Sequence, residues 1–212
     1  RITAAQIAGL GWTTAAIVVG AVVMTIVGGA WLGRRLGLTR AQSVLSGGAV
    51  AICGASAALA ISAVLPREKQ GDRFTLMVVV TVTVLSTVAM VIYPLVCRLL
   101  DLPPELAGLF LGGTIHDVAQ VVGAGFTLGH ETGDYATVVK LFRVAMLAIV
   151  VVVVSSLFKA ERERAAADHA GGAAPARQAL VPWFLWVFVA LVVANSLGAL
   201  PGVLQQQLGE LS

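Results

Sequence analysis

Four polar side chains stand together in the middle of an apolar stretch of this chain. The stretch covers residues 106–128 (LAGLFLGGTIHDVAQVVGAGFTL), with Thr114, His116, Asp117 and Gln120 at its centre. About 20 residues of helix suffice to cross a bilayer, which predicts that His116 and Asp117 lie near the midplane. An ionisable group costs roughly 2.5–3.5 kcal/mol at that depth, and a chain tolerates the cost when the group faces a cavity, a partner or a substrate. The pattern therefore suits ion coordination, proton exchange or anion binding.

Glycines next to this cluster weaken the helix where the polar groups sit. Gly112 and Gly113 directly precede it, so we expect the helix to be interrupted between about Gly112 and Asp117. Gln120 follows His116 by four residues and Asp117 by three, so that on one helix it would share a face with both. The alternative interpretation is a polar cluster that only holds helices together.

A second apolar run, residues 43–65, carries Cys53, Gly54 and Ser56 near its middle. Its many small residues are typical of close helix packing, which explains them without any site. The functional interpretation is a second interrupted helix whose free amides near residues 54–56 hold an anion. Broken helices tend to occur in pairs in transporters, so we expect this motif to lie close to residues 116–120.

Lys140 and Arg143 lie one turn apart near the start of the fifth apolar run. Both side chains are long enough to reach the membrane surface, and this explains them without a site. The alternative is that one of them faces Asp117 or an anionic substrate. Arg143 is the deeper of the two.

The composition identifies an integral membrane protein. The chain is 58% hydrophobic and 12% charged, with a mean hydropathy of +0.92. Its net charge of +3 comes from short loops between apolar runs, which does not indicate a nucleic-acid partner. Cys53 and Cys97 lie inside apolar runs, so no disulfide is predicted. The sequence carries none of the enzyme motifs we considered, and three scattered histidines make a poor metal set, so we predict neither an enzyme nor a cofactor.

Long apolar runs without alternating polarity predict an all-α polytopic bundle. Six runs are long enough to span: residues 13–32, 43–65, 74–96, 106–128, 136–158 and 181–200. Residues 159–178 form a soluble loop whose start can extend the fifth helix. If all six runs cross fully, eight basic residues fall on one side and four on the other, and the richer side is predicted to be cytoplasmic.

Several segments resemble a bacterial membrane-protein family of the YeiH type, to which sulfate export has been attributed. They are AICGASAALA (51–60), GGTIHDVAQVVGAG (112–125), KLFRVAML (140–147) and VPWF (181–184). This chain has Asp117 where the family pattern has Glu, which keeps the charge and shortens its reach. The resemblance implies discontinuous crossing helices, an inverted-repeat transporter fold, and a chain that is incomplete at both ends.

The predicted function is secondary transport of a small inorganic or organic anion, such as sulfate or a sulfonate, across the bacterial inner membrane. Asp117 and His116 would couple this transport to protons or sodium. An ion channel is one alternative, because the same segment can line a pore. The other is a non-transporting membrane protein with a buried packing cluster. The sequence does not determine whether the protein forms a homo-oligomer.

Overall fold

The computed structural model describes residues 11–66 and 70–169, and these form an assembly of helices without strands. The predicted sixth run, residues 181–200, lies outside the described residues. The helices in chain order are α2 (Trp12–Arg35), α3 (Arg40–Ala51), α4 (Ala55–Ser62), α5 (Gly71–Leu99), α6 (Pro104–Thr114), α7 (Val118–Leu128), α8 (His130–Leu157) and α9 (Lys159–His169).

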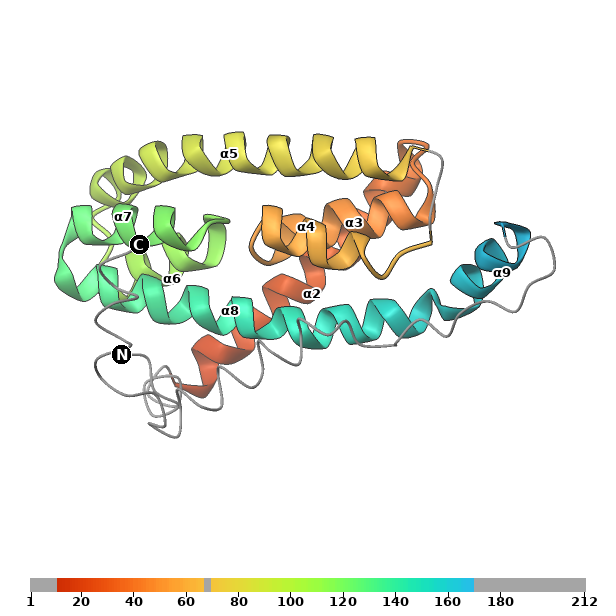
Figure 1. Cartoon of the computed structure of the whole chain (residues 1–212). Helices are drawn as coiled ribbons and strands as arrows, with labels where there is room; N and C mark the ends of the chain where they lie inside the picture. Colours follow the sequence, from red (N-terminus) through yellow and green to blue (C-terminus); the bar gives the residue numbers. More distant parts are fainter. Residues whose placement is uncertain (1–10, 67–69, 170–212) are drawn as a thin grey trace, which may run out of the picture.

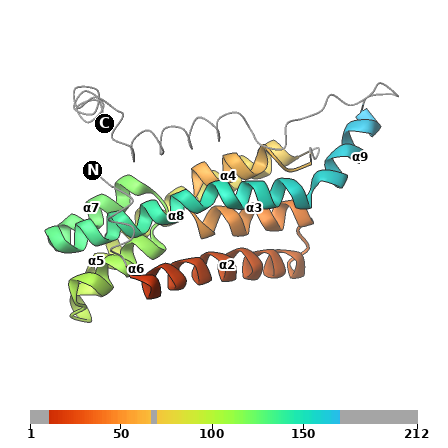
Figure 2. The same cartoon turned by 90° about the horizontal axis from the view of Figure 1, so that it is seen from below.

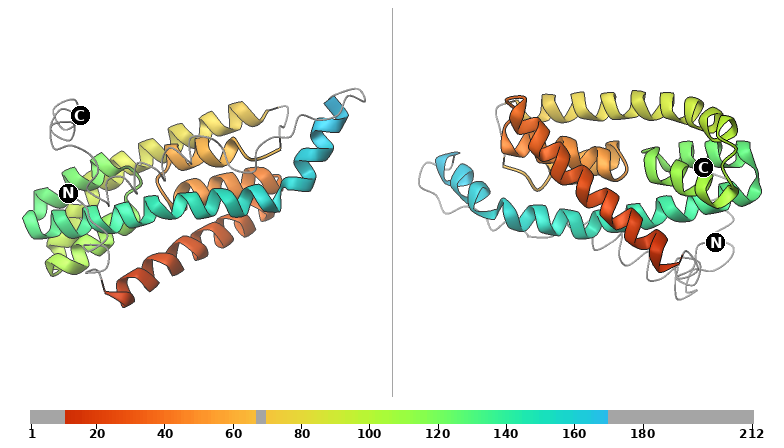
Figure 3. Two further views of the ribbon diagram at one scale, coloured as in Figure 1. Left: turned by 60° about the horizontal axis from the view of Figure 1, so that its bottom comes forward. Right: turned by 180° about the vertical axis from the view of Figure 1, so that it is seen from behind.

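Three of these helices, α2, α5 and α8, are long and apolar enough to cross a membrane. They contain 24, 29 and 28 residues, which at 1.5 Å per residue gives lengths of about 36 to 44 Å, more than the roughly 30 Å of a bilayer core. Helices α5 and α8 lie along opposite sides of the molecule, with the shorter helices between them (Figure 1). Seen from behind, helix α2 runs obliquely across α8 (Figure 3, right). The chain is thus built as a multi-pass membrane protein.

The second apolar run folds back on itself instead of crossing. Helix α3 ends at Ala51, and α4 returns alongside it, so that a Cβ on Gly48 would overlap the Ile61 side chain. Ala41 at the start of α3 and Leu65 after α4 share one buried cluster. We call α3 and α4 the first hairpin.

The fourth apolar run forms a second hairpin, α6 and α7, which enters from the opposite end of the molecule (Figure 1). Gly112 of α6 and Gly125 of α7 both pack against Ala136 of α8. A Cβ on Gly125 would lie 3.2 Å from the Ala136 Cβ, so these helices approach at backbone distance. Both hairpins therefore leave at the end where they entered.

This arrangement corrects the assumption that all six runs cross fully. The first hairpin turns at Gly54, whose φ of +64° lies in the left-handed region that favours glycine. Small residues along its facing helices then let the two backbones pack side by side. Because neither hairpin changes sides, Arg73 lies at the same end as Arg34, and Arg98 lies at the other end.

Local sequence signals start the hairpin helices. Thr39 and Gln42 form a reciprocal capping box at the start of α3. Pro104 occupies the first turn of α6, where its missing N–H is no loss. Asp117 caps α7 with its side chain. Each hairpin thus begins or turns where the sequence offers a cap.

Close packing of small residues fixes α2 against the first hairpin. Gly29 of α2 meets Gly47 of α3, and Gly33 meets Ser43, with no room for a Cβ at either glycine. Figure 2 shows α2 running beside α3 along one edge of the molecule. The first half of the predicted soluble loop, residues 159–169, is helical as α9, while residues 170–178 lie outside the described part.

Candidate functional site

The tips of the two hairpins meet in the middle of the molecule. The first tip is Ile52–Gly54 and the second is Ile115–Asp117. A Cβ on Gly54 would lie 3.1 Å from the Cβ of His116 and 3.3 Å from a methyl group of Val82 on α5. The cysteine motif and the histidine motif are therefore in direct contact. We call this contact and its surroundings the tip junction.

Lys140 of α8 joins the two tips. Its side chain is completely buried. Its Nζ donates hydrogen bonds to the Ile52 carbonyl at 2.7 Å and to the Ile115 carbonyl at 2.9 Å. One ammonium group thus satisfies a carbonyl oxygen at the end of α3 and another at the end of α6.

Arg143, one turn further along α8, repeats this pattern one step deeper into each hairpin. Its side chain is 5% exposed. The guanidinium donates to the Ala51 carbonyl at 2.6 Å and to the Gly112 carbonyl at 3.2 Å. Cations are stabilised at helix C-termini because the last carbonyls carry partial negative charge.

These contacts answer part of the question that the sequence left open for both residues, and a role in facing an anionic substrate stays a prediction. Neither side chain reaches the membrane surface, because both are buried between the hairpins. Neither forms an ion pair with Asp117, and within residues 11–66 and 70–169 the ion pair found is Arg40 with Glu161. The partners of these cations are backbone carbonyl groups, which no side-chain pattern reveals.

Asp117 caps the helix that follows it. Its Oδ1 accepts hydrogen bonds from the Ala119 amide at 2.9 Å and the Gln120 amide at 3.2 Å. The residue is exposed on the surface of the described chain. Its carboxylate therefore stands exposed at the second tip, with Oδ1 committed to α7.

Ser86 of α5 holds the second tip, and the sequence analysis missed it. Its Oγ accepts hydrogen bonds from the amides of His116 (3.1 Å) and Asp117 (3.3 Å), and donates to Gln120 Oε1. The Gln120 amide nitrogen in turn donates to Thr87 Oγ1 at 3.1 Å. Ser86 sits in a run of Val and Thr, where one more hydroxyl does not stand out. The signal that could have pointed to Ser86 is the predicted break in the helix, because the free amides at a broken helix need hydrogen-bond acceptors on another element.

His116 brings an unused polar atom to the junction. Its Nδ1 is buried and has no hydrogen-bond partner among the described residues. An unpaired polar atom at such depth is unfavourable unless a ligand, a proton or a water serves it.

The remaining predicted site residues divide between the junction and its margins. Cys53 is buried at the start of α4, where its sulfur meets the Ala57 amide and the Ser56 side chain. The Thr114 Oγ1 donates to the Phe110 carbonyl of its own helix at 2.5 Å, so this hydroxyl is left only as an acceptor. Among the described residues, no group of three or more His, Cys, Asp or Glu side chains gathers as a metal site.

The charges at the tip junction do not cancel. The C-termini of α3 and α6 contribute about half a negative charge each, and the N-termini of α4 and α7 about half a positive charge each. These four helix ends offset one another, while the Asp117 carboxylate offsets one of the two cations. With His116 neutral, about one positive charge remains. The junction therefore carries a net positive charge when Lys140 and Arg143 are both charged.

Comparison with known proteins gives a family match over the whole chain. The family described as "Conserved hypothetical protein 698" matches residues 1–212. The chain is 50% identical over 212 residues to the UPF0324 membrane protein TauZ of Paracoccus pantotrophus, covering 100% of this chain and 61% of that protein. It is 46% identical over 212 residues to the UPF0324 membrane protein CT0845 of Chlorobaculum tepidum, covering 100% of this chain and 57% of that protein.

The chain thus spans about three fifths of the length of the curated relatives it matches. No solved structure matches it.

Proposed function

Because the chain belongs to the family described as conserved hypothetical protein 698, whose relatives are UPF0324 membrane proteins, we propose that it forms the substrate-binding part of a secondary transporter for a small anion. The observation that carries the proposal is the tip junction. Two buried cations, Lys140 and Arg143, hold two hairpin tips together at mid-depth in a multi-pass membrane protein.

The donors near the junction suit an oxyanion. Helix α4 begins at Ala55 without a side-chain cap, and its Ala57 amide already meets the Cys53 sulfur, so the amides of Ala55 and Ser56 are the donors proposed for an anion. The exposed Ser56 adds a hydroxyl at the same helix end. Backbone amides at a helix N-terminus favour phosphate-like and sulfate-like groups. Sulfate and short alkyl sulfonates are therefore the first substrates to test.

The arrangement of the hairpins supports an inverted-repeat transporter fold. Each hairpin lies between two long helices in the chain order, and the two hairpins enter from opposite ends (Figure 1). In secondary transporters with inverted repeats, the interrupted helices of the two repeats meet at the substrate site. The proposed site lies at the corresponding place.

Coupling of transport to protons or sodium is assigned to the second tip. Asp117 presents an exposed carboxylate whose Oδ1 caps α7, and the preceding residue, His116, has a buried ring nitrogen without a partner among the described residues. A carboxylate binds either ion and a histidine can relay the proton, so loading this tip would change the charge that the anion meets.

The test is flux through the full-length protein in proteoliposomes, with sulfate and alkyl sulfonates, under imposed pH or sodium gradients. Asp117→Asn keeps the shape and can keep the cap, but removes the titratable charge. It should abolish gradient-driven transport, whereas Asp117→Glu should retain most of it. Asp101→Asn is a matched control, because Asp101 is exposed beyond the end of α5 and its positive φ of 47° is tolerated by Asn.

Four outcomes of this test are informative. Saturable flux that follows the gradient supports the coupled carrier. Non-saturating current would instead identify a channel. Flux that is unchanged in Asp117→Asn, with the same pH profile, would reduce Asp117 to a helix cap and refute the coupling role. Absence of flux for a broad anion panel favours a membrane protein without transport.

A further inference from the structure

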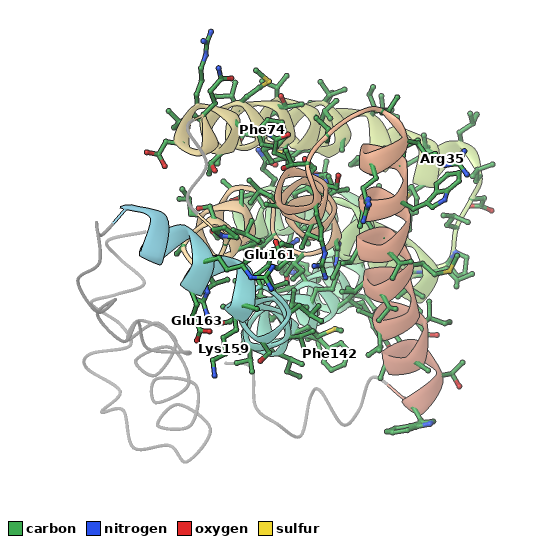
Figure 4. All side chains as sticks on the ribbon, turned by 90° about the vertical axis from the view of Figure 1, so that its right-hand side faces the viewer. Arg35, Phe74, Phe142, Lys159, Glu161 and Glu163 are labelled. Carbon is green, nitrogen blue, oxygen red and sulfur yellow. The ribbon has the colours of Figure 1, made fainter. Side chains whose placement is uncertain are left out.

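The basic side chains gather at one end of the molecule. At this end α2 and α8 finish and α3 and α5 begin, and Figure 4 looks onto it with Arg35, Lys159, Glu161 and Glu163 marked. The basic residues at this end, within the described ranges, are Arg34, Arg35, Arg40, Arg73, Lys159, Arg162 and Arg164. We call it the basic end.

The opposite end has the reverse character. There α5 and α7 finish and α6 and α8 begin. Of the described Lys and Arg residues, Arg98 alone lies there, and its guanidinium is engaged with the Thr127 carbonyl at 2.9 Å. The acidic residues at this end are Asp101, Glu105, Glu131 and Asp134. We call it the acidic end.

We propose that the basic end faces the cytoplasm. Short loops rich in Lys and Arg are retained on the cytoplasmic side of membrane proteins. Basic residues near the surface are also attracted by the anionic lipids of that leaflet. Among the described residues, seven basic residues lie at the basic end against one at the acidic end, and the hairpins place Arg73 at the basic end and Arg98 at the other.

This orientation assigns a side to each hairpin. The first hairpin enters from the cytoplasm, so it separates the tip junction from the cytoplasm. The second hairpin enters from outside and separates the junction from the external solution. The assignment of sides stands on charge and topology alone, whereas the reading of the hairpins as barriers on a transport route rests on the proposed function.

The experiment is cysteine labelling of the full-length protein in intact Gram-negative cells with a membrane-impermeant maleimide that passes the outer membrane. The single variants are Arg35→Cys and Lys159→Cys at the basic end, and Asp101→Cys and Glu131→Cys at the acidic end. All four positions are exposed, and the native Cys53 and Cys97 are buried, so the unmodified protein supplies the background. Labelling after denaturation confirms that each variant is present.

We expect Asp101→Cys and Glu131→Cys to react in intact cells, and Arg35→Cys and Lys159→Cys to lose all labelling unless the inner membrane is permeabilised. The reverse pattern would overturn the orientation. Reaction of all four variants from outside would overturn the arrangement of hairpins and long helices itself. Labelling does not require transport, so a failed flux experiment does not affect the conclusion about orientation. A failed labelling experiment likewise does not affect the conclusion about transport.

Discussion

Replacement of Lys140 by methionine tests whether one ammonium group holds the two hairpin tips together. Methionine has a similar length and fills similar space, but it cannot donate a hydrogen bond. The carbonyl groups of Ile52 and Ile115 would lose the donor that now lies 2.7 and 2.9 Å away. Both tips should then open more readily, because of the two cations that join the hairpins only Arg143 remains.

The free energy that Lys140→Met removes from the closed tips follows from the number and kind of hydrogen bonds that Lys140 donates. A hydrogen bond to a charged group contributes roughly 1.5–3 kcal/mol, so two of them give roughly 3–6 kcal/mol. This is a large share of the 5–15 kcal/mol that typically separates folded from unfolded states. An opening equilibrium shifts tenfold for every 1.4 kcal/mol, so the lower figure corresponds to roughly a hundredfold more opening.

The native Cys53 reports this opening directly. It lies on the first tip and is 8% exposed. Its reaction rate with a small thiol reagent should therefore rise by roughly a hundredfold in Lys140→Met, in the full-length protein in detergent. Cys97 is 2% exposed at the far end of α5, so its rate should change little and it serves as an internal reference.

Lys159→Met supplies the matched control, because it removes the same charge from an exposed position at the end of the same run. Its Cys53 rate should stay close to that of the unmodified protein. The reasoning fails if Lys140→Met leaves the Cys53 rate unchanged, or if Lys159→Met raises it equally. The first result would mean that the two carbonyl contacts contribute little to closing the tips.

Two further changes probe the tips from other sides. Ser86→Ala leaves the amides of His116 and Asp117 without their acceptor, so it should destabilise the protein by roughly 1–3 kcal/mol and lower the flux. Thermal unfolding and the proteoliposome assay measure the two effects. An unchanged melting temperature and an unchanged flux would contradict this prediction. Gly54→Ala places a Cβ at a φ of +64° and 3.1 Å from His116, and should lower the free energy of unfolding by about 1–2 kcal/mol or more. Gly20→Ala is the control, because the space around Gly20 is open, and it should be neutral or stabilising. Equal melting temperatures for the two alanine variants would count against the contact between the tips.

The sequence carries enough information for the class of protein but not for the path of its chain. Long apolar runs can form only helices or barrels in a bilayer, and the lack of alternation selects helices. A run of 23 residues, however, has the same composition whether it crosses or turns back. The turn depends on one backbone angle at Gly54 and on which small residues face each other, and both are properties of the folded chain.

Part of the candidate site could likewise be predicted from the sequence, and part could not. His116, Asp117 and Gln120 stand out because polar groups are costly in an apolar run. Lys140 and Arg143 also stand out, yet their partners do not, because every residue has a carbonyl group and the fold alone decides which ones are free. Ser86 went unnoticed for a related reason, since its importance comes from two backbone amides on another element. The sequence therefore shows polar side chains better than it shows what they serve.

The bond between Lys140 and Ile52 also has a consequence for the order of events during synthesis. The two residues are 88 positions apart, which at 5–20 residues per second is roughly 4 to 18 s of translation. Throughout that interval the carbonyl end of α3 exists without its cation, and hydrocarbon offers no substitute. The first hairpin should accordingly stay in a hydrated or protein-lined environment, such as the insertion machinery. It should enter the lipid bilayer only after α8 has been synthesised. In this order of events α8, the last long helix among the described residues, brings the earlier first hairpin into its final position.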